Sequence, residues 1–80
     1  MTLKPIITEK AVMMIEAQNV LTFVTNMKKS KEDIKKEVEE LFEVKVEKIR
    51  TLIRNNKKYV YVKLKQNFPA IDLATKLGLI

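Results

Sequence analysis

The pattern of apolar and polar positions is most regular between residues 31 and 42. Apolar side chains recur there at i, i+4, i+7 and i+8, which is the spacing of one face of a helix. Ser30 precedes this stretch and Asp33 comes three residues later, as in a capping box. We therefore predict a helix over residues 31–42 with an acidic, solvated outer face. Its apolar stripe has four members, Ile34, Val38, Leu41 and Phe42.

Three stretches show the alternation typical of strands, residues 20–25, 45–54 and 59–65. The first is apolar on both faces, which predicts a strand inside the sheet. The second loses strict alternation, which predicts a β-bulge or burial on both faces. The third alternates cleanly, with valines on one face and Tyr59 and Tyr61 on the other.

Shorter elements flank these strands. Residues 4–7 predict a short first strand, and Thr8 is suited to cap a helix whose first turn holds Glu9. Asn19 is suited to end that helix in the left-handed region, and Gly78 to end a last helix.

The element order is therefore β-α-β-α-β-β-α. It predicts an α+β fold, a split β-α-β arrangement with a three- to four-stranded, mostly antiparallel sheet and helices packed on it. We expect residues 59–65 to lie between residues 20–25 and 45–54, with a tight hairpin turn at Asn55-Asn56. Eighty residues make one domain, residues 1–80, with little room for a deep cleft.

The distribution of charge adds evidence about function, because the net charge of +6 is concentrated in one block. Residues 48–65 hold seven basic residues and no acid, whereas residues 31–48 hold five lysines against seven acids, a net charge of −2. A one-signed basic block attracts polyanions, most often nucleic acid or an anionic membrane surface. Lysines also protect exposed sheet edges from aggregation, so charge alone leaves both interpretations open.

Composition restricts the chemistry. The chain has no cysteine and no histidine, which excludes the usual catalytic triads and zinc sites. No apolar run approaches 18 residues and no signal peptide is apparent, so we expect a cytoplasmic protein without membrane insertion. We expect no enzyme activity, cofactor, metal or small-molecule substrate.

Two other families share parts of this pattern. An acylphosphatase-like enzyme has a similar size and topology, but its glycine-rich phosphate loop has no counterpart in a chain with one glycine. An RNA-recognition motif would need a glycine- and aromatic-rich strand, which is also missing. Tyr59 and Tyr61 could stack on bases or pack under a helix, and the sequence leaves both alternatives open.

Four blocks of sequence together resemble a known family. The segments KPIITEKA, KEDIKKEVEELFEVKVEKIRTLI, KKYVYVKLK and ATKLGLI are similar, in order and spacing, to the large-subunit ribosomal protein L23 family, and the compact form resembles its archaeal type. The resemblance implies a structural protein that binds 23S rRNA at the rim of the polypeptide exit tunnel. It also implies ribosomal protein L29 as a neighbour and signal recognition particle as a docking factor. The alternative is a free-standing RNA-binding or regulatory module of the same fold.

The basic block and the resemblance together suggest specific sites. The exposed Glu9, with Thr8 and Lys10, matches the family position that contacts docking factors. Bacterial members have a long basic hairpin that reaches into the tunnel, whereas residues 54–58 alone join the strands here. Family members often have Gly or Asn at the position of Glu43, which predicts mild strain there. The predicted RNA-binding residues are Lys4, Lys28, Lys29, Arg50, Arg54, Asn55, Asn56, Lys57 and Lys58.

Overall fold

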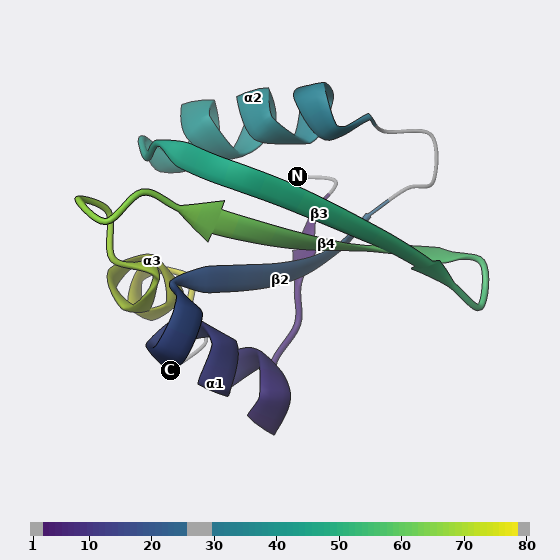
Figure 1. Ribbon diagram of the computed structural model, residues 1–80, viewed down its shortest axis with the longest axis horizontal. Coiled ribbons are helices and arrows are strands. Elements are labelled where there is room, and N and C mark those ends of the chain that lie inside the picture. The colour runs from purple at the N-terminus through teal and green to yellow at the C-terminus, as the bar shows by residue number, and fades with distance from the viewer. Residues whose placement is uncertain (1–2, 26–29, 79–80) are drawn as a thin grey trace.

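The computed structural model describes residues 3–25 and 30–78 (Figure 1). Lys28 and Lys29, two of the predicted RNA-binding residues, lie outside the described residues. The elements in chain order are β1 (Lys4–Pro5), α1 (Glu9–Gln18), β2 (Val20–Thr25), α2 (Lys31–Phe42), β3 (Val46–Arg54), β4 (Lys57–Leu64) and α3 (Ala70–Lys76).

The four strands form one antiparallel sheet in the order β1-β2-β4-β3. Strand β4 therefore lies between β2 and β3, which confirms the predicted α+β fold and its split β-α-β arrangement. The cross-strand register places Phe23 opposite Val60 and Leu21 opposite Val62. Because side chains alternate along a strand, these four share one face of the sheet.

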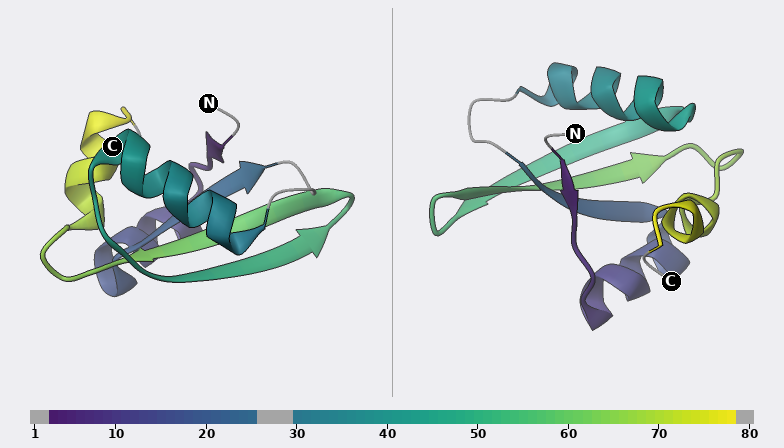
Figure 2. Two further views of the ribbon diagram at one scale, coloured as in Figure 1. Left: turned by 90° about the horizontal axis from the view of Figure 1, so that it is seen from above. Right: turned by 180° about the vertical axis from the view of Figure 1, so that it is seen from behind.

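Helices lie on both sides of the sheet. Figures 1 and 2 show α2 along one face and α1 on the other side, with α3 beside α1 at the end of the sheet. The face under α2 carries most of the core, where Phe23, Ile34, Val38, Val60 and Val62 are fully buried. The ring of Phe23 stacks on that of Phe42, with centroids 6.4 Å apart, and so joins β2 to α2.

Local sequence signals account for most helix and turn boundaries. The hydroxyl of Thr8 accepts a hydrogen bond from the backbone N–H of Ala11 at 3.0 Å, and that of Ser30 accepts one from Asp33 at 3.2 Å. Both are the predicted N-caps. Asn19 ends α1 with φ of 58°, as predicted, and its side chain has a larger role described below.

Among the described residues, four more have positive φ, and each follows the end of a helix or lies in a turn. Glu43 ends α2 with φ of 54°, so the strain expected at this position is present. Asn55 and Asn56 form the tight turn between β3 and β4, and Gly78 follows α3. Glycine, asparagine and, less readily, other residues are found in this backbone region because a side chain crowds the carbonyl there.

Two features of the α2 prediction were wrong. Leu41 is 53% exposed, because the helix contacts the sheet along a narrower stripe through Ile34 and Val38. The acidic face is not entirely solvated either, since Glu39 Oε2 accepts a hydrogen bond from the backbone N–H of Val46 at 2.9 Å. Glu39 thus joins the end of α2 to the start of β3.

The predicted irregularity of β3 is a bulge. Val46 pairs with Leu64 and Lys48 with Lys63, so the register shifts between them and Glu47 is the extra residue. The bulge lets Val46 and Ile49, three positions apart, point into the same core. It also fixes which face of the sheet receives the residues that follow.

Candidate nucleic-acid interface

The face of the sheet opposite α2 collects most of the exposed basic residues of β3 and β4. Arg50 lies opposite Tyr61, which lies opposite Thr22, and Arg54 lies opposite Lys57. Residues directly opposite one another point to the same side of a sheet. We call this surface the basic sheet face and define it by seven residues, Lys48, Arg50, Arg54, Lys57, Tyr59, Tyr61 and Lys63.

The predicted RNA-binding residues are divided between several surfaces. Arg50, Arg54 and Lys57 are exposed and lie together on the basic sheet face. Lys58 points to the opposite side, where it is half-buried and already engaged by another group of the chain. The exposed Lys4 lies on the edge strand β1 opposite Val24, and therefore on the same side as Tyr59.

The hairpin tip projects beyond the helices, as Figure 1 shows at the end of β3 and β4 opposite α3. Asn55 and Asn56 form the tip and are exposed. The backbone there turns within two residues, so Arg54 and Lys57 are held opposite each other on its two strands. Two cationic side chains with no acid nearby in the sequence suit a phosphate-rich surface.

Three basic residues near this face were not among the predicted RNA-binding residues. Lys48 and Lys63 belong to the acid-free block, and alternation from Arg50 and Tyr61 would have identified both. Lys10 was predicted to contact docking factors, but it lines the same groove as Tyr61. Nothing in the sequence places α1 over this side of the sheet.

A groove runs between α1 and the basic sheet face. It consists of two adjoining hollows of about 330 and 210 Å³ that share Lys10, Met14 and Tyr61. Lys48, Arg50 and Lys63 border the first, and Arg54 and Tyr59 border the second. None of the residues lining either hollow is acidic.

One acid lies close to the basic sheet face. Glu47, the bulge residue, has its Oε2 atom 3.9 Å from the Nζ atom of Lys63. Both side chains are about half exposed, at 53% and 49%, so water screens the pair and it contributes little to stability. Lys63 therefore keeps much of its ability to attract an anion.

The comparison with known families decides the broader assignment. Residues 1–71 match the family model of Ribosomal protein L23. The chain belongs to the ribosomal protein L23 family. It is therefore a non-enzymatic structural protein of the large ribosomal subunit that binds rRNA and serves translation. The basic sheet face gives this L23-family chain a surface of suitable charge.

The segment predicted to contact docking factors begins α1 of this L23-family chain. Thr8, Glu9 and Lys10 are all exposed. The Thr8 hydroxyl is used as the helix cap, and Lys10 points toward the groove. Glu9 forms no ion pair with any residue in the described parts of the chain. Of the three side chains, that of Glu9 is the one most available to a partner.

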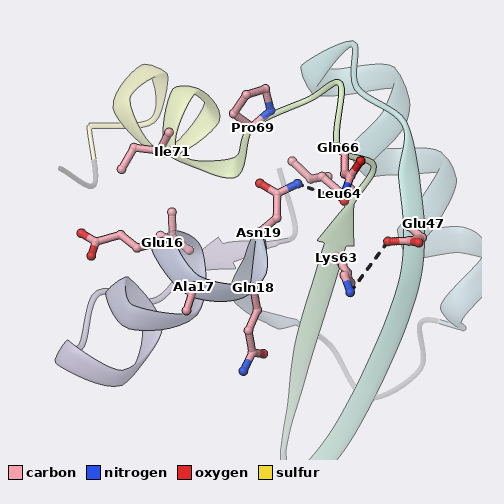
Figure 3. A pocket seen from close by; sticks show the side chains of 11 residues that line it. Glu16, Ala17, Gln18, Asn19, Glu47, Lys63, Leu64, Gln66, Pro69 and Ile71 are labelled. Atoms are coloured by element: carbon pink, nitrogen blue, oxygen red, sulfur yellow. Dashed lines mark hydrogen bonds and ion pairs between the residues drawn. The ribbon is translucent and has the colours of Figure 1, made fainter.

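A third hollow, of about 620 Å³, lies between the end of α1 and the start of α3 (Figure 3). Glu16 and Glu47 line it together with Lys63, so its charge is mixed. Asn19 also lines it, but the amide of Asn19 bonds the backbone of its own chain. Asn19 therefore has a structural role in this hollow, and the two carboxylates make the hollow unfavourable for a phosphate.

Residues 3–25 and 30–78 contain neither a cluster of metal ligands nor a membrane-spanning helix. Their acidic side chains form no cluster able to hold a metal ion. Within the same residues, no helix is both long and apolar enough to cross a membrane.

Proposed function

We propose that this L23-family chain binds 23S rRNA through the basic sheet face and the hairpin tip, at the rim of the polypeptide exit tunnel. The observation that carries the proposal is the convergence of Arg50, Arg54 and Lys57 on one exposed face. Lys4 extends this surface across the sheet, and Lys28 and Lys29 are retained as proposed contacts from the sequence. Lys58 is the weakest member, because it lies on the α2 side.

The physical basis is release of counterions from the RNA. Each lysine or arginine that neutralises a phosphate frees a condensed cation, and affinity then falls as salt rises. The acidic helix α2 lies on the other side of the sheet, so its carboxylates do not oppose the RNA (Figure 1). The two signs of charge are thereby separated by the thickness of the sheet.

A second part of the proposal concerns the exit-site partners. The resemblance supports ribosomal protein L29 as a neighbour and signal recognition particle as a factor docking on Glu9. Glu9, Met13 and Glu16 are exposed at i, i+4 and i+7, and they form one outer stripe of α1. An acidic stripe with an apolar centre suits a partner that presents basic and apolar side chains together.

The short hairpin supports a compact, archaeal-type arrangement. Asn55 and Asn56 alone form the turn between β3 and β4, without the extension that lines the tunnel in bacterial members. We therefore propose that the chain stays at the tunnel rim. The alternative, a free-standing RNA-binding module, predicts that the native protein is washed from large subunits by high salt.

The RNA part is tested by the salt dependence of binding to large-subunit rRNA. We expect the double substitution Arg54→Ala, Lys57→Ala to reduce the slope of log affinity against log salt by about one to two, at roughly 0.7–0.9 per contact. Lys35→Ala is the matched control, because Lys35 is exposed on α2. Equal slopes for the double variant and the wild type would remove the hairpin from the interface.

The docking part is tested by Glu9→Gln, which removes the charge and keeps the shape. We expect ribosomes carrying this variant to bind signal recognition particle more weakly, while the melting temperature falls slightly because a first-turn acid contributes about 0.3–1 kcal/mol. Glu40→Gln, on the exposed side of α2, is the control. Undiminished binding of the factor would leave Glu9 with a structural role alone.

A further inference from the structure

The groove between α1 and the basic sheet face contains the only two tyrosines of the chain. We propose that it holds one unpaired nucleotide of the rRNA, with the base stacked against Tyr61. This inference rests on the proposed function, since it assumes that the basic sheet face meets rRNA. It adds a recognition element that phosphate contacts alone do not supply.

The position of Tyr61 carries the argument. Its neighbours across the sheet are Thr22 on β2 and Arg50 on β3, and Met14 of α1 borders the same space. Tyr61 is half-buried, so its ring is held by the protein yet still borders an open groove. Among the described residues, the Tyr59 and Tyr61 rings form no contact with another aromatic ring. No aromatic ring among these residues therefore competes with a base for stacking on Tyr59 or Tyr61.

The charge around the groove identifies the kind of ligand. Lys10, Lys48, Arg50, Arg54 and Lys63 border it from α1, β3 and β4, and no acid lines it. A protein segment would need to bring acidic residues to match this border, whereas a nucleotide carries a phosphate beside each base. An aromatic platform within a cationic groove is the usual way in which proteins hold unpaired nucleotides.

The size and shape of the groove favour a single base over a helix. Its larger hollow, of about 330 Å³, is at the lower end of the range of about 300–1,000 Å³ for small-ligand sites. Bases inside a duplex are stacked on their neighbours, whereas bases in loops and bulges can turn outward onto aromatic side chains. Thr22 borders the groove, but its hydroxyl oxygen is fully buried and so offers a base no accessible hydrogen-bonding group. We therefore expect stacking with little selection between bases.

The test measures binding of purified chain to full-length large-subunit rRNA over a series of salt concentrations. Tyr61→Leu removes the ring, and we expect a loss of affinity of about fivefold to 150-fold, the range for losing one stacked base, with an unchanged salt slope. Tyr61→Phe keeps the ring and should bind like the wild type. Melting temperatures show whether each variant is folded. If Tyr61→Leu unfolds, the photochemical cross-link described next carries the test, and its absence from the Tyr61 peptide would overturn the inference.

A second measurement does not depend on substitution. Irradiation of the wild-type complex at short wavelength should link a nucleotide to the peptide that contains Tyr59 and Tyr61, which mass spectrometry can identify. Unchanged affinity in Tyr61→Leu, or an equal loss in Tyr61→Phe, would overturn the inference. So would a folded Tyr61→Leu variant that binds rRNA normally but loses a ribosomal protein from the subunit.

Failure of this inference differs from failure of the proposed function. If Tyr61→Leu binds normally while Arg54→Ala, Lys57→Ala still flattens the salt slope, the basic sheet face binds rRNA and the groove does not. If the slope of the double variant is unchanged while Tyr61→Leu weakens binding, the groove is supported and the hairpin is not part of the interface.

Discussion

The strongest prediction about stability concerns Asn19, which ends α1 and also holds the start of α3. Its Nδ2 atom lies 3.0, 3.3 and 3.2 Å from the carbonyl oxygens of Leu64, Lys65 and Phe68. Its Oδ1 atom accepts a hydrogen bond from the backbone N–H of Ala70 at 2.5 Å. Figure 3 shows this side chain between the end of β4 and the loop before α3.

The expected cost of replacing Asn19 has two parts. An amide NH₂ has two hydrogens, so the three Nδ2 contacts amount to two hydrogen bonds at a time, beside the one at Oδ1. Losing three bonds lowers the free energy of unfolding by about 1.5–4.5 kcal/mol. An alanine at φ of 58° adds about 1–2 kcal/mol of backbone strain. A protein of this size has a total stability of roughly 4–12 kcal/mol.

Two substitutions separate these parts. Asn19→Ala removes the bonds and introduces the strain, whereas Asn19→Gly removes the bonds and tolerates the positive φ. We expect both variants to be destabilised, and Asn19→Gly to be the more stable by about 1 kcal/mol. Urea unfolding followed by circular dichroism gives both values. Equal stabilities for the two variants would refute the strain argument, and a loss below about 0.5 kcal/mol in both would refute the hydrogen-bond argument.

Two further predictions concern the C-terminal end of α2. Glu43→Gly should stabilise the chain by about 0.5–1 kcal/mol, because glycine relieves the positive φ and costs only a modest amount of entropy in the unfolded state. Glu43→Ala should give no gain, and thermal unfolding of the two variants measures the difference. Glu39→Ala should lower the free energy of unfolding by about 1.5–3 kcal/mol, because the N–H of Val46 loses a charged acceptor. Glu39→Gln should retain most of this stability, because its side-chain oxygen can still accept the bond. Urea unfolding measures both variants, and equal losses would contradict the role of Glu39 as the acceptor.

Periodicity predicted the sheet well because the two faces of β4 differ clearly in polarity, whereas β2 is apolar on both faces and lies inside the sheet. Phe23 and Val60 are fully buried on one face, and a shift of the strand register by one residue would turn both side chains to the other face. The caps at Thr8 and Ser30 were equally predictable, since each depends on a side chain and an N–H three residues away. These capping signals are local, so they do not depend on how the helices pack against the sheet.

Leu41 and Glu39 show where periodicity stops being informative. A helical stripe states which residues share a side, but the curvature and width of the opposing surface determine how much of that side is covered. Leu41 lies at the margin of the contact and stays exposed, and Glu39 lies at the opposite margin and finds a backbone N–H. The exposure of Leu41 and the hydrogen bond of Glu39 therefore depend on the position of the sheet beneath α2 more than on the type of either residue.

The candidate site was predictable in part, for a related physical reason. Alternation from Arg50 places Arg54 on the same face and Lys58 on the other, and the two-residue turn places Lys57 with Arg54. Alternation does not state which face a helix covers. Had α1 and α2 exchanged sides, the acids of α2 would border the cations of β3, and Lys10 would be far from Tyr61. The separation of charge on which the proposed RNA surface depends is therefore a property of how the helices are arranged around the sheet, and this arrangement becomes visible only in three dimensions.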